Sequence, residues 1–511
     1  MDLLHSAWIP VTELGRKVSQ RISLRQLLCE DKRYLFCLPR DDMEMAAMQL
    51  ILCLVQVMCI PENFSVWRQR GREPLSEEEY QRLSAPFAGM FDLQHPDHPF
   101  MQTKGVKASE ITDMDKLLTG LSGSTNCAFV NEPGQAEALC PGCTAIVLFN
   151  QANNAPGFGG GFKSGLRGGA PVTTLLYAEH IRTTLWFNIL TEETLNAEYA
   201  VDWKNSLNQP PVWIEPIKSG ESIPAEKIGL LRGLFWQPAH IELLPPLGEG
   251  LCTLCGQPHA QRFSGFYKEK FNFTVEGMWL HPHSPRLFAI KKGVVEQKFL
   301  AFTTAAPSWT QLSRVIVKQQ VAQKIEGQSP AIVVNQAIKL FTDNSKWMLM
   351  LGGYRNNQAS IIERRHDVFN LSPEILRNPL WVDYIVKIGR EYKKALRSAL
   401  YQFYIGLKSK DIKMKGTGVP LHEVMEPLFY SHSESAILDA LSGYLVQDED
   451  HLEDLLRKQL DLLCRELFNR ATDPYLHHPA ITVIAALTRR KLGQDLNHLQ
   501  PQKGIVDEAI H

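Results

Sequence analysis

The chain has 511 residues, a formal net charge of −1 and a sequence pI near 7.0. At roughly 100–200 residues per domain this length indicates more than one domain, and the balanced charge excludes a protein that holds nucleic acid through global basicity. The first residues lack the layout of a signal peptide, and no uncharged apolar run reaches about 18 residues. We therefore expect a cytoplasmic protein with no membrane partner.

The N-terminal segment predicts a pair of strands followed by a buried helix. Residues 8–28 have the pattern of a strand, a turn centred on Gly15, a second strand and the start of a helix. Residues 41–59, DDMEMAAMQLILCLVQVMC, then predict a helix that is capped by Asp41 and Asp42 and buried on most sides.

The middle and the C-terminal part of the chain differ in pattern. From about residue 85 to 360, short apolar runs such as TAIVLF, which we interpret as a strand, alternate with long loops rich in Gly, Pro and Asn. After Ser372, four segments repeat apolar residues every three or four positions and predict a C-terminal four-helix bundle. The expected fold class is α+β, with a mixed α/β domain over residues 1–368 and an all-α bundle over 369–511.

Four of the ten cysteines form two C-x-x-C pairs, Cys140 with Cys143 and Cys252 with Cys255. Together the pairs offer four thiolates to a tetrahedral structural zinc, although they lie far apart in the chain. Two alternatives stay open. The pairs could be reduced and independent, or CPGC could be a redox dithiol, although it lacks the strand and helix context of one.

The stretch PGFGGGFKSGLRGG runs from Pro156 to Gly169 and contains seven glycines. Residues 157–164 nearly match a Walker A loop, but Phe162 stands where that loop needs its second glycine, which disfavours a phosphate cradle. One alternative is a flexible surface loop. The other is a glycine backbone that approaches a polyanion, with Lys163 and Arg167 as nearby cations.

Residues 352–360, GGYRNNQAS, indicate the tip of a β-hairpin. We interpret Asn356 and Asn357 as its tight turn, because Asn tolerates positive φ. A plain solvent-exposed turn is the default interpretation. The alternative is a rigid polar wedge that enters a step of a nucleic-acid duplex.

Candidate catalytic groups are isolated in the sequence. His366 and Asp367 form a lone HD pair, and we interpret the histidines beside prolines, at 281, 283, 477 and 478, as capping or surface residues. No G-x-S-x-G, S-x-x-K or H-E-x-x-H motif occurs. The sequence therefore predicts no catalytic constellation.

Several long motifs together closely resemble the large subunit of the type I-E CRISPR Cascade complex, the CasA family. They are LPRDDMEMAAM, HPFMQTKGVKA, TNCAFVNEPGQAEALCPGC, NQANNAPGFGGGFKSGLRGG, GLFWQPAHIEL, KFLAFTTAAPSWTQ and GGYRNNQASIIERRHDV. The resemblance spans the chain and is densest from about residue 95 to 367. It implies a non-catalytic subunit of an RNA-guided surveillance complex, whose partners are other Cascade subunits, the guide CRISPR RNA, double-stranded target DNA and a helicase-nuclease.

The resemblance also implies roles for individual residues. In this family a glycine loop and a lysine contact the protospacer-adjacent motif (PAM) from the minor groove, a wedge starts unwinding and R-loop formation, another loop contacts the guide RNA and neighbouring subunits, and cysteines bind zinc. The matching positions are Gly159, Gly160, Gly161 and Lys270 for the PAM, Asn357, Gln358 and Ala359 for the wedge, Phe129 and Asn131 for the guide, and Cys140, Cys143, Cys252 and Cys255 for the zinc.

Two competing hypotheses belong to other classes of protein. A nucleotide- or DNA-hydrolysing enzyme would use Gly157 to Ser164, or His366 and Asp367. A pure scaffold would bind partners through the bundle, with the glycine stretch and the hairpin tip incidental.

Overall fold

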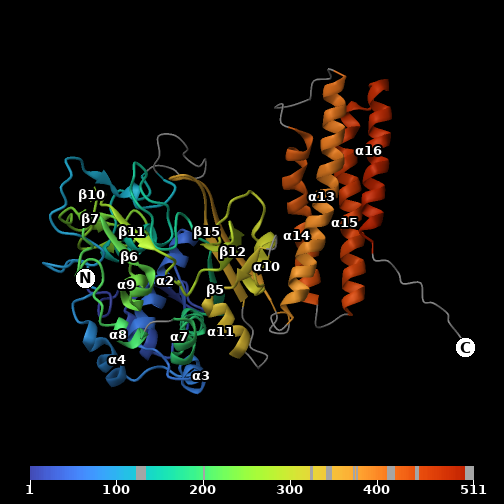
Figure 1. Ribbon diagram of the computed structural model, residues 1–511. Helices are drawn as coiled ribbons and strands as arrows, with labels where there is room; N and C mark the ends of the chain where they lie inside the picture. Colours follow the sequence, from blue (N-terminus) through green and yellow to red (C-terminus); the bar gives the residue numbers. More distant parts are fainter. Residues whose placement is uncertain are drawn as a thin grey trace, which may run out of the picture. The chain divides into compact units, whose positions relative to one another are not determined.

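The computed structural model describes residues 1–121, 134–199, 202–322, 326–340, 348–371, 375, 378–410, 420–443 and 448–500. The described chain forms two compact units. The first combines Met1–Thr304 with Lys318–Asn370, and the second combines Ala305–Val317 with the residues from Leu371 onward. In Figure 1 the first unit mixes helices and strands and the second is helical, which confirms the predicted α+β class.

The N-terminal strands and helix fold as predicted. Strand β1 (Ile9–Glu13) pairs antiparallel with β2 (Ser19–Ile22) on one side and with β3 (Tyr34–Phe36) on the other. Helix α1 (Leu24–Cys29) begins at Ser23, whose side chain accepts a hydrogen bond from the backbone N–H of Gln26 in a capping box.

Helix α2 (Asp41–Met58) is the predicted buried helix, and nearly all of its side chains are buried. The predicted capping residues are wrong, because the helix is preceded by Arg40 and neither aspartate caps it. Asp41 and Asp42 instead occupy the first turn, where negative charge favours the positive end of the helix dipole.

The run TAIVLF lies in helix α5 (Pro141–Asn153), so its interpretation as a strand is wrong. Every residue of α5 is buried, and an apolar run buried on all sides carries no period that separates helix from strand. Pro141 in the first turn is the local signal for a helix start. Because α5 packs against α2, these two buried helices form much of the centre of the first unit.

Shorter elements surround this centre. The remaining helices of the first unit are α3 (Phe64–Arg72), α4 (Glu77–Ser84), α6 (Ile181–Phe187), α7 (Glu192–Glu198), α8 (Trp203–Ser206), α9 (Leu230–Leu234) and α11 (Ile332–Leu340). Its smaller sheets have the strand orders β4-β10-β7, β11-β6, β13-β12-β14 and β8-β9. Their strands are β4 (Thr112–Asp113), β6 (Glu221–Pro224), β7 (His240–Leu243), β8 (Gly250–Leu251), β9 (Pro258–His259), β10 (Gly265–Glu269), β11 (Phe273–Glu276), β12 (Arg286–Lys291), β13 (Val294–Phe299) and β14 (Gly327–Ser329).

The longest strands form the predicted hairpin, β15 (Met348–Asn357) and β16 (Ser360–Asn370). Strand β5 (Thr173–Tyr177) pairs with β15 only from Met348 to Gly352, so the far half of the hairpin extends beyond its sheet. Asn357 pairs with Ser360, which makes Gln358 and Ala359 the two-residue turn. The predicted turn at Asn356 and Asn357 is therefore two positions too early.

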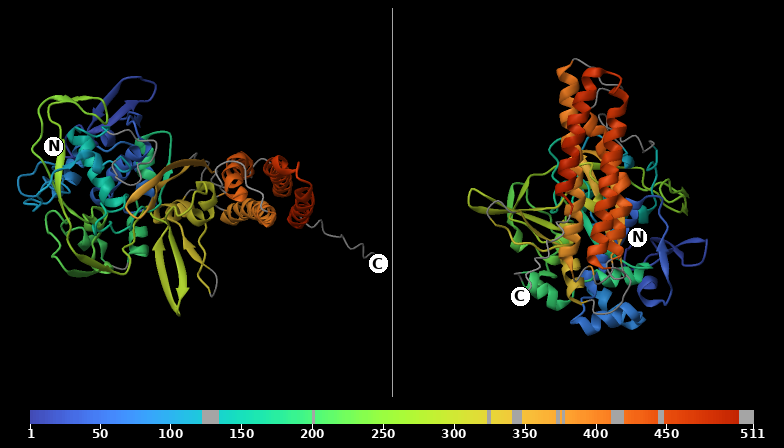
Figure 2. Two further views of the ribbon diagram at one scale, coloured as in Figure 1. Left: turned by 90° about the horizontal axis from the view of Figure 1, so that it is seen from above. Right: turned by 90° about the vertical axis from the view of Figure 1, so that its right-hand side faces the viewer.

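The second unit contains the predicted helices as α13 (Pro379–Ser409), α14 (Leu421–Ser442), α15 (Glu449–Thr472) and α16 (Pro479–His498). They run side by side in Figures 1 and 2. A short 3-10 turn (Ser308–Gln311) and α10 (Leu312–Ile316) pack on α13. A Cβ on Gly389 would lie 2.9 Å from the buried Trp309 ring, so a glycine there permits this packing. The domain boundary at 368/369 stays a prediction. In the structure, residues 305–317 also belong to the helical unit.

Candidate nucleic-acid interface and zinc site

The glycine stretch is an organised loop that joins α5 to β5. Gly159, Gly160 and Gly161 have φ values of 81°, 58° and 89°, in the left-handed region that favours glycine. The Phe158 and Phe162 rings pack edge to face with centroids 5.4 Å apart. A Cβ on Gly165 would lie 2.1 Å from the Ala152 carbonyl oxygen, so the chain also needs glycine there for close packing. All three observations argue against a structureless surface loop.

The loop lacks the context of a nucleotide-binding P-loop. A Walker A loop leads directly into a helix, whereas residues 154–172, all of which the structure describes, contain no helix and lead into β5. The backbone N–H of Gly157 donates to the Ser164 hydroxyl at 3.2 Å, so both groups are engaged within the loop. This geometry agrees with the interpretation that Phe162 prevents a phosphate cradle.

Three segments that are distant in sequence meet at the tip of this loop. The Lys270 ammonium, just after β10, donates to the Gly160 carbonyl oxygen at 3.1 Å. A Cβ on Gly159 would lie 3.4 Å from the Cβ of Ala359 in the hairpin turn. Gly160, Lys270 and Ala359 are all exposed. The structure thus brings the predicted PAM residues and the predicted wedge into one exposed surface.

The hairpin turn is held in a conformation that is costly for its sequence. Gln358 has φ of 54°, which a non-glycine residue seldom adopts. The side-chain amide of Asn356 donates to the Gln358 carbonyl oxygen at 2.6 Å and stabilises the turn. Asn357 and Gln358 are exposed, so both side chains are available to a partner.

A buried chain of hydrogen bonds connects the hairpin to the glycine loop. The Tyr354 hydroxyl of β15 donates to Asp42 at 2.8 Å and accepts from the Asn150 amide at 2.8 Å. Asn150 in turn accepts from Asn154 at 3.1 Å, and Asn154 accepts from Arg167 at 2.6 Å. Burial, followed by the negative charge of Asp42, raises the pKa of Tyr354 well above its ordinary value, so the hydroxyl stays a donor.

The interpretation of Arg167 as a cation that faces a polyanion is wrong. Only 3% of this residue is exposed, and its guanidinium donates to Asn154, the Ser284 hydroxyl and the Thr173 hydroxyl. Burial lowers its pKa to about 9. Arg167 therefore anchors the end of the glycine stretch inside the protein and offers no charge to an external phosphate, whereas Lys163 is exposed.

The four paired cysteines converge as the zinc interpretation predicts. All four sulfur atoms lie within 4.8 Å of one another, and those of Cys140 and Cys255 are 4.0 Å apart. A tetrahedral zinc with Zn–S bonds of about 2.3 Å separates its sulfur ligands by about 3.8 Å. Arg21 of β2 donates to the sulfurs of Cys255 and Cys140 at 3.2 and 3.5 Å, which partly offsets the negative charge of four thiolates.

The thiols in this cluster shift one another's pKa values in opposite directions. Hydrogen bonding with Cys140, and then with Cys252 and Cys255, raises the pKa of Cys143 well above its ordinary value. Hydrogen bonding with Cys140 and Cys143 lowers the pKa of Cys252 to about 6 and also lowers that of Cys255. The convergence of all four sulfurs, which are the ligands of a structural zinc site, fits zinc and favours it over two independent pairs.

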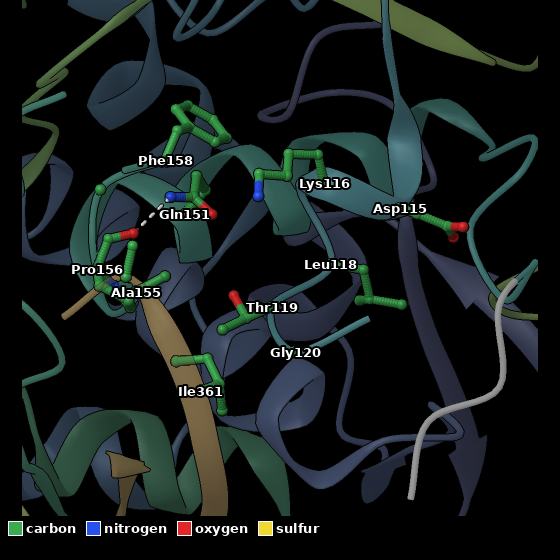
Figure 3. Close-up of a pocket in the computed structure, with 12 residues that line it drawn as sticks. Asp115, Lys116, Leu118, Thr119, Gly120, Gln151, Ala155, Pro156, Phe158 and Ile361 are labelled. Carbon is green, nitrogen blue, oxygen red and sulfur yellow. Dashed lines mark hydrogen bonds between the residues drawn. The ribbon is translucent and has the colours of Figure 1, made fainter. Parts of the chain in front are cut away.

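A small pocket lies between the glycine loop and the hairpin (Figure 3). Its volume is about 40 Å³. Pro156 and Phe158 line it from the glycine stretch, and Ala359 and Ile361 line it from the hairpin. Lys116 extends into the same space, whereas the Asp115 carboxylate points away from it in Figure 3.

The other predicted positions fall into three groups. Phe129 and Asn131 lie outside the described residues. His281 and His283 are buried, with ring centroids 5.1 Å apart, so their assignment as surface residues is wrong, whereas the His281 ring does accept a local hydrogen bond from the backbone N–H of His283 at 3.2 Å. His366 and Asp367 lie on β16, and the described residues that could hold a metal contain no cluster around them. Sequence reasoning missed Lys116, Tyr354 and Arg21, for which no local motif gave a signal.

Comparisons with known proteins find a matching family model and structures of similar fold. The family model described as CRISPR-associated protein Cse1 matches residues 2–467. CasA (Cse1) of Thermus thermophilus is 18% identical, with a TM-score of 0.71 over 98% of this chain and 99% of that chain. Cse1 of Thermobifida fusca is 14% identical, with a TM-score of 0.73 over 98% of each chain.

A chain of a structure described as a CRISPR RNA-guided surveillance complex is also similar. It is 15% identical, with a TM-score of 0.60 over 96% of this chain and 99% of that chain. At such identities these likenesses show a shared fold. Within the described ranges, no helix has both the length and the apolar composition that a bilayer crossing requires.

Proposed function

The chain belongs to the CRISPR-associated Cse1 family, the large-subunit family of the Cascade surveillance complex, and on that basis we propose that it recognises the PAM in double-stranded target DNA. In this proposal it acts in the cytoplasm as the non-catalytic large subunit of a type I-E complex. The protein reads only the short motif, and base pairing between the guide RNA and the target strand reads the remaining sequence.

The observation that carries the proposal is the meeting of Gly160, Lys270 and the hairpin turn on one exposed surface. Three glycines without Cβ atoms let the backbone approach the base edges in a minor groove, and Lys270 adds one positive charge. The minor groove distinguishes mainly A·T from G·C pairs. We therefore expect recognition that accepts several related motifs.

The hairpin turn supplies the next step of the proposal. Gln358 enters the duplex beside the PAM and separates the first base pair of the target. Unstacking one step costs a few kcal/mol, and the growing RNA–DNA heteroduplex replaces the DNA pairing that is lost. The hairpin therefore starts the exchange of strands, and base pairing drives it to completion.

The remaining parts of the proposal concern structure and partners. The four cysteines hold a structural zinc that joins the start of α5 to the segment between β8 and β9. A set of four sulfur ligands leaves no open position for catalysis. The assembled complex recruits the helicase-nuclease that degrades the DNA, and residues 129 and 131 contact the guide RNA and neighbouring subunits.

Gly160 offers a direct test of the proposed contact. Gly160 has φ of 58° and an exposed position with nothing within 4 Å of an added Cβ, and Asn is the side chain that tolerates this backbone best. Gly160→Asn should therefore preserve the fold but hold the backbone away from the DNA. We expect the assembled complex to bind a PAM-containing duplex about tenfold more weakly, as for the loss of one good base contact.

The matched control is Gly168→Asn. Gly168 is also exposed, has φ of 82° and has open space around an added Cβ, but it lies outside the segment 159–161. Electrophoretic mobility shifts with duplexes that contain or lack the PAM would compare both variants. Equal affinity for the PAM duplex in Gly160→Asn and the wild type would refute the proposed contact.

A further inference from the structure

Lys116 is an unassigned cation at the edge of the proposed DNA site. It ends a short 3-10 turn (Met114–Lys116), and the flanking Met114 and Leu117 are fully buried, which fixes the backbone at this position. The half-buried Lys116 side chain lines the small pocket together with Pro156, Phe158, Ala359 and Ile361. Figure 3 shows its amine pointing toward the side of the pocket where Gln151 and Phe158 lie.

Within the described part of the chain, the Lys116 ammonium has no anionic partner. Lys116 has no hydrogen bond or ion pair with any residue that the structure describes. The neighbouring carboxylate of Asp115 already accepts hydrogen bonds from the backbone N–H groups of Gly134 and Ala136, at 3.3 and 3.0 Å. A half-buried charge without a partner is unfavourable unless an external anion neutralises it.

Other cations reinforce the positive charge near Lys116. Burial, followed by the positive charge of the nearby Lys116, lowers the pKa of Lys268 of β10. Lys270 follows two residues later and contacts the glycine loop. Although the Glu110 carboxylate partly offsets this charge, lysines from two segments thus lie close together here and favour a polyanion.

The size of the pocket limits what can enter it. A volume of about 40 Å³ is room for only a few water molecules, so a nucleobase does not fit. The oxygens of a backbone phosphate do fit, because they can contact the Lys116 ammonium at the mouth of a shallow pocket. Ala359 of the hairpin turn forms part of the wall, so a DNA strand that passed the hairpin would bring its phosphates close to this pocket.

We propose that Lys116 binds a backbone phosphate of the target DNA where the duplex meets the hairpin turn. This inference rests on the proposed function, since it assumes that DNA reaches the hairpin. It adds a residue that positions the DNA without reading its sequence, because phosphate contacts carry no base information. A guide-RNA phosphate is the competing ligand.

The test is the salt dependence of DNA binding by the complete complex, with guide RNA and all subunits. Lys116→Met keeps the aliphatic length of the side chain and removes its charge. Loss of one phosphate contact should reduce the slope of log K against log salt by about 0.9. The affinity gap between the wild type and the variant should then narrow about 3.5-fold for each fourfold rise in salt.

Two further variants make the result specific. Lys116→Arg retains the charge and should restore the wild-type slope. Lys339→Met removes one charge from an exposed lysine on α11 that does not line the pocket, and should leave the slope unchanged. The ratio of affinities for duplexes with and without the PAM should stay the same in all three variants.

The outcomes separate this inference from the proposed function. An unchanged slope in Lys116→Met, while Gly160→Asn still weakens PAM binding, overturns only the role of Lys116. Loss of guide RNA from the Lys116→Met complex, with an unchanged slope for DNA, assigns the lysine to RNA and also overturns it. A wild-type complex that binds duplexes with and without the PAM equally overturns the proposed function itself.

Discussion

At the scale of single residues, Gln358 has a backbone conformation that favours glycine and a side chain that is available to a partner. Its φ of 54° is a conformation that favours glycine, yet the chain places a long polar side chain there. A left-handed backbone costs a non-glycine residue about 1–2 kcal/mol. A residue that retains such a conformation at an exposed turn is a candidate for function rather than for stability.

Two substitutions at Gln358 distinguish the contribution of its side chain to strand separation from that of its strained backbone. Gln358→Gly removes the side chain and relieves the strain, whereas Gln358→Ala removes the side chain and keeps the strain. We expect both variants to lose strand separation almost completely, as measured by the fluorescence of 2-aminopurine placed beside the PAM in the assembled complex. Thermal denaturation should show the Gly variant to be at least as stable as the Ala variant.

Other outcomes at Gln358 would change the conclusion. Strand separation that survives in both Gln358→Ala and Gln358→Gly would favour a scaffold with an incidental hairpin. Strand separation that survives in Gln358→Ala but not in Gln358→Gly would assign the effect to the rigidity of the turn and not to the amide.

At the scale of elements, the glycine loop and the hairpin are positioned by buried polar groups. Tyr354 joins strand β15 to α2 through Asp42 and to α5 through Asn150. Since α5 leads directly into the glycine loop, the same hydroxyl fixes both contact elements. Among the described residues, no further strand pairs with the hairpin beyond Gly352, so this buried link constrains the part that carries the turn.

Tyr354→Phe should loosen this arrangement while the core packing is retained. The substitution leaves the buried groups of Asp42 and Asn150 with one hydrogen bond fewer each, which costs about 1–3 kcal/mol. We expect PAM binding to weaken several-fold and strand separation to fall by a larger factor, because the turn loses its fixed distance from the glycine loop. Binding affinity and 2-aminopurine fluorescence measure the two effects separately.

Tyr80→Phe is the matched control for Tyr354→Phe. The Tyr80 hydroxyl is also buried and donates to the Leu4 carbonyl oxygen at 2.6 Å, but it has no bond to the hairpin or the glycine loop. Both variants should lower the melting temperature. Equal losses of strand separation in both would show that stability, and not position, explains the effect of Tyr354.

The elements also show what the sequence could predict. The four long helices, the N-terminal strands and the hairpin follow from periodicity and turn chemistry, which are local. Helix α5 was missed because an apolar run buried on all sides has no period. Arg167 was misassigned because its burial depends on partners such as Ser284, far away in the chain. Lys116 and Tyr354 act through tertiary contacts, and no local pattern encodes those.

At the scale of the whole molecule, the cysteine cluster connects segments that no other covalent or metal link among the described residues joins. Cys140 precedes α5 and Cys143 lies in its first turn, whereas Cys252 and Cys255 lie between β8 and β9. The other end of α5 begins the glycine loop. A zinc in this cluster would therefore stabilise the helix on which the proposed DNA contacts depend.

Cys252→Ser should remove the zinc and weaken DNA binding indirectly. Zinc binding contributes roughly 10–16 kcal/mol in small zinc-finger peptides, but here a large core remains, so we expect a lower melting temperature rather than complete unfolding. We expect about one zinc per chain by atomic emission in the wild type and none in the variant. Arg21→Gln should keep the zinc but release it to a chelator about 10–100-fold more readily, as for other residues that support metal ligands.

Cys464→Ser separates the loss of zinc from the loss of a buried thiol. Cys464 is fully buried in the second unit and donates to the Tyr392 carbonyl oxygen at 3.6 Å. This variant should retain its zinc and its affinity for the PAM duplex even if its melting temperature falls. A wild-type chain purified without zinc, or a Cys252→Ser variant that still holds one equivalent, would contradict the zinc assignment. Loss of zinc with normal PAM binding would instead show that α5 holds the glycine loop in place through its buried packing and hydrogen bonds alone.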